Sequence, residues 1–127
     1  MSVLPKSILV VDDEPSILSL LVEHLEGSGY EAFGAETAQQ AIALLDGHHS
    51  VDLLISDFRL NDGMNGLMVA EAALRSLPDI KVLFISGHPY EVWEAESFKQ
   101  MNALLLGKPF MLDQLDHSID ELLAVSE

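Results

Sequence analysis

The sequence contains no cysteine and only six basic residues, and each shortage excludes a class of function. Without cysteine there are no disulfides and no thiolate metal ligands, which suits a protein of a reducing compartment. The six lysine and arginine residues are outnumbered by 21 acidic ones, so the net charge is −15. Nucleic-acid binding depends on basic side chains that replace counterions at phosphates. We therefore expect neither DNA nor RNA as a direct partner.

Long apolar runs are also missing. No stretch approaches the ~20 apolar residues that span a bilayer, and the first apolar run stops at Asp12, too early for a signal peptide. These absences predict a cytoplasmic protein without a membrane partner. The 127 residues, of which 49% are hydrophobic, are sufficient to form a core of their own. Because no linker or repeat is visible, we expect a single domain over residues 1–127 and no output domain.

Five segments have the length and composition of strands. Four of them are continuous, mainly aliphatic runs, as expected for parallel strands covered on both faces. The second segment is weaker, which indicates a position at an edge of the sheet. The five predicted strands are Ser7–Val11, Glu31–Ala35, Val51–Asp57, Lys81–Ser86 and Ala103–Gly107.

Stretches with helical periodicity lie between and after these strands. Pro15 suits a first helical turn, and Thr37 with Gln40 fits a capping box at the start of the second helix. The fourth helix carries few apolar residues, so we expect it to pack least tightly against the sheet. Strand–helix alternation predicts an α/β fold with a doubly wound parallel sheet and right-handed crossovers. The predicted helices are Pro15–Glu26, the segment that follows Thr37, Asn65–Leu77, Tyr90–Met101 and Met111–Val125.

Polar residues stand where four of the predicted strands end. Since the carboxyl ends of parallel strands meet at one edge of a sheet, these residues should converge. Three carboxylates within about 4 Å of one another would repel by roughly 4 kcal/mol per pair at an effective dielectric near 20, which favours a bound cation. Oxygen-only ligands favour Mg²⁺ or Mn²⁺ over zinc. The converging residues are Asp12 and Asp13 after the first strand, Asp57, Ser86 and Lys108.

Asp57 is the best candidate for a nucleophile, because a carboxylate can form an aspartyl phosphate. Lys108 supplies an ammonium that balances charge on a phosphoryl group, and Ser86 supplies a hydroxyl donor. Each residue alone has an ordinary structural reading, since acids and Ser-Gly pairs are common in caps and turns. Their joint placement favours a site, because independent loops need not carry complementary chemistry.

These residues, in this order, resemble the receiver domain of two-component response regulators. The resemblance covers nearly the whole chain, from Ile8 to Phe110. It implies a flavodoxin-like (βα)5 fold with strand order 2-1-3-4-5 and helices on both faces. It also implies a phosphohistidine donor, on a sensor histidine kinase or a histidine phosphotransfer protein, and a downstream target protein.

Site roles follow from the same resemblance. Asp57 matches the phosphoacceptor, Ser86 the hydroxyl residue that turns toward the phosphoryl group, and Lys108 the lysine beside it. The Lys108–Pro109 bond would be cis by analogy. The positions that match the Mg²⁺ site are Asp12, Asp13, Asp57 and, through its backbone carbonyl, Arg59.

Three departures from the family pattern stand out. Family members usually carry Tyr or Phe three residues before the lysine, where this chain has Leu105. The loop after Asp57 lacks the common Met-Pro pair. The two positions that tune aspartyl-phosphate lifetime hold Arg59 and His88, a combination that predicts no particular lifetime.

The sequence therefore predicts a stand-alone receiver that is phosphorylated on Asp57 with Mg²⁺ and acts as a signalling protein, not a metabolic enzyme. Phosphorylation would change a surface formed by the last two helices and the strand Ala103–Gly107. A receiver-like module that binds without phosphorylation is the alternative, which Leu105 keeps open. Haloacid-dehalogenase chemistry needs a second aspartate where Arg59 stands. A flavin or nucleotide phosphate would be repelled by the acids after the first strand.

Overall fold

A computed structural model of the chain describes residues 5–47, 50–61 and 63–124. Its centre is one sheet of five parallel strands in the order β2-β1-β3-β4-β5. This order confirms the doubly wound α/β fold and the edge position of the second strand. The third strand begins at Leu53, two residues later than predicted. The strands are β1 Ser7–Val11, β2 Glu31–Ala35, β3 Leu53–Asp57, β4 Lys81–Ser86 and β5 Ala103–Gly107.

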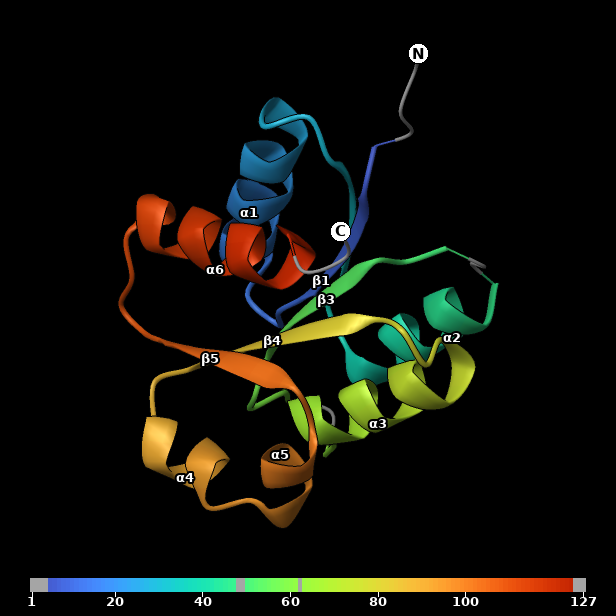
Figure 1. Cartoon of the computed structure of the whole chain (residues 1–127), viewed down its shortest axis with the longest axis vertical. Coiled ribbons are helices and arrows are strands. Elements are labelled where there is room, and N and C mark those ends of the chain that lie inside the picture. Colours follow the sequence, from blue (N-terminus) through green and yellow to red (C-terminus); the bar gives the residue numbers. More distant parts are fainter. Residues whose placement is uncertain (1–4, 48–49, 62, 125–127) are drawn as a thin grey trace.

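Helices cover both faces of the sheet (Figure 1). Helices α1 and α6 pack on one face, while α2, α3 and the two short helices α4 and α5 lie on the other (Figure 1). In the described part of the chain, no helix is both long and apolar enough to cross a membrane. The helices are α1 Pro15–Gly27, α2 Ala38–Gly47, α3 Gly66–Ser76, α4 Pro89–Trp93, α5 Glu96–Gln100 and α6 Leu112–Ala124.

The central strands are buried on both sides because their side chains alternate between two cores. In β1, Ile8 and Val10 pack toward α1 and α6, whereas Leu9 and Val11 pack toward α2 and α3. Every residue of β1, β3 and all but the first of β4 is buried. The strand ends are thereby held rigidly, which fixes the residues that stand on them.

Helix starts follow the local sequence closely. Thr37 Oγ1 accepts a hydrogen bond of 3.0 Å from the Gln40 N–H, as a capping box predicts. The return bond is shifted by one residue, because Gln40 Oε1 accepts from the Glu36 N–H at 2.8 Å. Asn65 caps α3 by accepting from the Met68 N–H at 3.0 Å.

The single helix predicted over Tyr90–Met101 is wrong. The chain forms α4, then passes through an extended residue, Ala95 (φ −71°, ψ 127°), and resumes as α5. Val92 of α4 is fully buried, and the Phe98 ring of α5 lies 5.9 Å from the Phe84 ring. In one continuous helix these two residues, six positions apart, would point about 120° away from each other. The break allows both to reach the core. At the other end of the chain, Val125 of the last predicted helix lies outside the described residues.

Candidate functional site

Four strand ends meet at one edge of the sheet. Parallel pairing places Val11 opposite Ser56, Asp57 opposite Ile85 and Ser86 opposite Gly107. Asp12 follows β1 directly, and Lys108 follows β5. The polar residues that the sequence places after separate strands therefore stand side by side at the carboxyl edge of the sheet, where open α/β sheets bind ligands.

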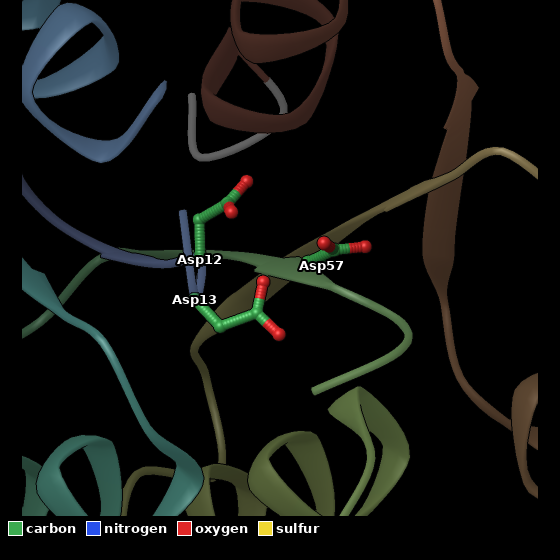
Figure 2. A group of neighbouring side chains, drawn as sticks. All are labelled: Asp12, Asp13 and Asp57. Atoms are coloured by element: carbon green, nitrogen blue, oxygen red, sulfur yellow. The ribbon is translucent and has the colours of Figure 1, made fainter. Parts of the chain in front are cut away.

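Three carboxylates gather at this edge. Figure 2 shows Asp12 and Asp13 beyond the end of β1, next to Asp57 at the end of β3. Each offers an oxygen, and these oxygens all lie within 4.8 Å of one another. Asp12 and Asp57 are buried, whereas Asp13 is half-buried. A cluster of this kind has the geometry and the oxygen donors of a divalent-cation site.

Burial makes the negative charges of Asp12 and Asp57 unfavourable unless positive charge lies nearby. Burial raises the pKa of Asp57 above its ordinary value, although the Lys108 hydrogen bond and charge lower it in part. Burial likewise raises the pKa of Asp12, against the opposing effects of the Glu14 N–H, which donates at 2.9 Å, and of Lys108. Further positive charge at this cluster would therefore favour the ionised carboxylates.

Lys108 brings a cation to the two buried carboxylates. Its Nζ donates to Asp57 Oδ2 at 3.1 Å and lies 3.9 Å from Asp12 Oδ2. Burial lowers the pKa of Lys108. The hydrogen bond and charge of Asp57 and the charge of Asp12 raise it by more than burial lowers it, so the net shift is upward. The ammonium is therefore charged at neutral pH. The Lys108–Pro109 bond is cis.

Ser86 is buried at the end of β4. Its Oγ accepts a hydrogen bond of 2.9 Å from the His88 N–H, two residues later. A hydroxyl that accepts one bond keeps its own proton for donation. The strand ladder continues past Asp57, because the Phe58 N–H donates to the Ile85 carbonyl at 2.9 Å. Ser86 is thus held on the strand next to that of Asp57.

Two contacts around the Asp57 loop were not found from the sequence. Gly66, at the start of α3, donates its N–H to the Phe58 carbonyl at 2.8 Å, and a Cβ there would meet the Asp57 carbonyl oxygen at 2.6 Å. The sequence pattern predicted a helix that includes Gly66, but it did not predict this contact. Glu91 of α4 binds the Arg59 guanidinium through both carboxylate oxygens. No spacing rule links residues 32 positions apart, so only the folded chain reveals the pair.

Leu105 lies in the middle of β5, opposite Phe84 of β4. Its side chain is half-buried and packs against the core that contains Phe84 and Val92. The nearby aromatic contact is made by Phe84 with Phe98 of α5. An aliphatic side chain therefore occupies the strand position at which the family resemblance predicted an aromatic ring.

The match to known proteins decides the family. The model of the response regulator receiver domain matches residues 8–120. The chain belongs to the response regulator receiver family. This receiver therefore has the domain type of two-component response regulators, a class of signalling protein. The resemblance predicted from the strand-end residues is confirmed, while the individual roles of Asp57, Ser86 and Lys108 stay predictions.

Individual relatives agree in sequence and in fold. CpdR, a response regulator receiver protein of Brucella abortus (strain 2308), is 30% identical over 118 residues, which make up 93% of this receiver and 97% of CpdR. The transcriptional regulatory protein GlrR of Escherichia coli (strain K12) is 32% identical over 99% of this receiver, which spans only 28% of GlrR. The response regulator protein TrrA of Thermotoga maritima, solved in complex with Mg(2+)-BeF, is 32% identical with a TM-score of 0.81, covering 92% of this receiver and 98% of TrrA.

Proposed function

We propose that this receiver accepts a phosphoryl group on Asp57 from a phosphohistidine donor, on a sensor histidine kinase or a histidine phosphotransfer protein. The observation that carries the proposal is the Asp57 carboxylate itself. It is buried, hydrogen-bonded to the Lys108 ammonium at 3.1 Å, and joined by two further carboxylates within 4.8 Å. A buried acid with a cation and an oxygen-rich cluster beside it has the parts that phosphoryl transfer to a carboxylate requires.

The donor set fits Mg²⁺, or Mn²⁺ in its place. Carboxylate oxygens from Asp12, Asp13 and Asp57 lie close enough together to bind one ion, and no thiolate or imidazole belongs to the group. The backbone carbonyl of Arg59 would be the fourth protein ligand. When bound, the ion supplies positive charge for the carboxylates and for the phosphoryl oxygens.

Transfer to Asp57 needs no proton from the nucleophile. An Asp57 carboxylate oxygen attacks phosphorus, the P–N bond to the donor imidazole breaks, and its electron pair stays on that nitrogen. Lys108 balances the charge that moves onto the phosphoryl oxygens at Asp57. The Ser86 hydroxyl donates its proton in a hydrogen bond to one of them, since its present bond from His88 uses it only as an acceptor.

The signal then leaves through protein contact. The proposed receiver forms one domain over residues 1–127, acts in the cytoplasm, and works as a signalling protein and not as a metabolic enzyme. Its target is a protein that recognises a surface of α4, α5, β5 and α6. A net charge of −15 argues against a direct nucleic-acid partner.

One observation favours a second candidate. Leu105 replaces the usual aromatic ring on β5, so the connection between Asp57 and the far surface differs from the family pattern. The alternative is a receiver that binds its partner without phosphorylation. A haloacid-dehalogenase reaction is a poorer candidate, because Arg59 stands where that chemistry needs an aspartate and its guanidinium is bound to Glu91.

Acetyl phosphate and Mg²⁺ test the proposal directly. Intact mass should show one added phosphoryl group on the wild-type protein and none on Asp57→Asn. A wild-type protein that stays unmodified at saturating Mg²⁺, with its fold intact by circular dichroism, would overturn the proposal in favour of phosphorylation-independent binding.

A further inference from the structure

Helix α4 is attached to the Asp57 loop by one pair of side chains. Arg59 Nε donates to Glu91 Oε1 at 3.0 Å, and Nη2 donates to Oε2. This two-point geometry is specific to a guanidinium and a carboxylate. These hydrogen bonds, which Arg59 donates and Glu91 accepts, lower the pKa of Glu91 and raise the pKa of Arg59, so both stay charged.

Arg59 is close to Asp57 by its place in the chain. It lies two residues after Asp57, in a short β-bridge with Asn65. Burial raises the pKa of the Asp57 carboxyl, and the Arg59 backbone N–H opposes this rise in part. The side chain of Arg59 therefore starts beside the site but ends on α4.

Glu91 stands on the same five-residue helix as an exposed aromatic pair. Tyr90 and Trp93 are 75% and 50% exposed, and their rings meet edge to face at 5.6 Å. Val92 is the buried residue of this helix. Because α4 buries only Val92, its position also depends on its other contacts. The Arg59–Glu91 pair is a contact that connects α4 to the loop after Asp57.

The pair is easily broken. The side chains of Arg59 and Glu91 are 60% and 37% exposed, and exposed ion pairs are weak and screened by salt. A phosphoryl group on Asp57 would replace the single carboxylate charge with a group of nearly two negative charges and three acceptor oxygens, close to the start of the Arg59 side chain. Glu91 and the phosphoryl group would then compete for one guanidinium.

We propose that Arg59 and Glu91 are positioning residues that carry the state of Asp57 to α4. In the unmodified protein Glu91 holds the Arg59 guanidinium on the helix. After phosphorylation the guanidinium moves to the phosphoryl oxygens, and α4 with Tyr90 and Trp93 is released. This exchange supplies a connection that does not need an aromatic ring at position 105. The inference rests on the proposed function, because it requires a phosphoryl group on Asp57.

Trp93 is the single tryptophan of the chain and reports on α4 directly. Its emission is recorded before and after treatment with acetyl phosphate and Mg²⁺, and intact mass gives the fraction phosphorylated in the same sample. The variants are Glu91→Gln, Arg59→Gln and the double variant. Glu96→Gln is the matched control, since Glu96 is an exposed acid on neighbouring α5 that pairs with Lys99 at 3.6 Å.

In the wild type and in Glu96→Gln, Trp93 emission should shift in proportion to the phosphorylated fraction. Glu91→Gln and Arg59→Gln should show the shifted emission before treatment and no further shift after it, and the double variant should match them. Salt should move the unmodified wild-type emission toward that of Glu91→Gln and leave Glu91→Gln unchanged.

Two results would overturn the inference alone. The first is phosphorylation of the wild type, seen by mass, without any change in Trp93 emission. The second is that Glu91→Gln and Arg59→Gln have the emission of the unmodified wild type before treatment and shift fully when they are phosphorylated. A wild type that gains no phosphoryl mass would instead remove the proposed function and the inference with it.

Discussion

Gly66 and Asp57 meet backbone to backbone, since a Cβ on Gly66 would stand 2.6 Å from the Asp57 carbonyl oxygen. The same Cβ would lie 3.1 Å from the Phe58 Cα. Both neighbours are main-chain atoms in or beside a buried strand, so neither moves cheaply. The start of α3 therefore packs directly against the residue proposed to carry the phosphoryl group, and a side chain at position 66 would push the two main-chain segments apart.

Gly66→Ala should destabilise the protein by about 1–3 kcal/mol, because inserted atoms in a tightly packed region force the backbone apart. Urea denaturation measures the free energy of unfolding. Gly27→Ala is the matched control, since a Cβ at the end of α1 meets nothing within 4 Å, and it should be neutral or stabilising by up to about 1 kcal/mol. Equal effects of the two substitutions would contradict the close approach at Gly66.

Asp57→Asn should stabilise the metal-free protein at neutral pH, because it removes a charge that burial disfavours. Burial raises the pKa of Asp57, so removal of its charge relieves desolvation and repulsion that the Lys108 bond offsets only in part. Chemical denaturation in the presence of a chelator measures the difference. Asp79→Asn, at an exposed acid, should change little. A destabilised Asp57→Asn would mean that the Lys108 pair outweighs the burial of Asp57.

The sequence predicted most of this arrangement because its strongest patterns report burial. Continuous aliphatic runs such as Leu53–Ile55 mark strands covered on both faces, and a polar residue that ends such a run marks the edge of the sheet. Asp57 and Lys108, 51 positions apart, could be placed together from that rule alone. The start of the first helix followed from Pro15 in the same local way, and the helix predicted from Asn65 begins one residue later, at Gly66.

The remaining features depend on contacts that local patterns do not encode. The break at Ala95 arises because Val92 and Phe98 must both reach one core, and no glycine or proline between them signals it. The Arg59–Glu91 pair joins a side chain of the loop after β3 to a side chain of α4. Among 21 acidic residues, sequence alone offers no means to choose Glu91 as the partner.

Mg²⁺ should stabilise the wild-type protein, because an ion that binds only the folded state shifts the unfolding equilibrium by mass action. At about 100 times the dissociation constant the gain is roughly 2.7 kcal/mol. Thermal denaturation with and without Mg²⁺ measures it. Asp12→Asn and Asp57→Asn should lose most of the gain, since each removes a carboxylate of the cluster, whereas Asp79→Asn should retain it. An equal Mg²⁺ effect in all four proteins would place the ion elsewhere.

The advantage of Asp57→Asn over the wild type should depend on pH. The pKa of Asp57 is raised in the folded state, so this group stabilises the fold fully below its unfolded pKa of about 3.9. That contribution is lost as the pH rises through the raised folded pKa. In metal-free buffer the two proteins should therefore be similar in stability under acidic conditions and diverge toward neutral pH. Parallel stability curves across this range would contradict a raised pKa of Asp57.

Leu105→Ala should separate stability from phosphorylation. Leu105 is half-buried opposite Phe84, away from the carboxylates, so truncation should cost about 1–3 kcal/mol through lost packing. Phosphorylation of Asp57 by acetyl phosphate should continue at a similar rate, since Asp57, Lys108 and the acidic cluster are unchanged. Intact mass and urea denaturation measure the two effects on the same preparation. Loss of phosphorylation in a folded Leu105→Ala protein would show that the middle of β5 supports the chemistry at Asp57, and not only the path by which the signal leaves it.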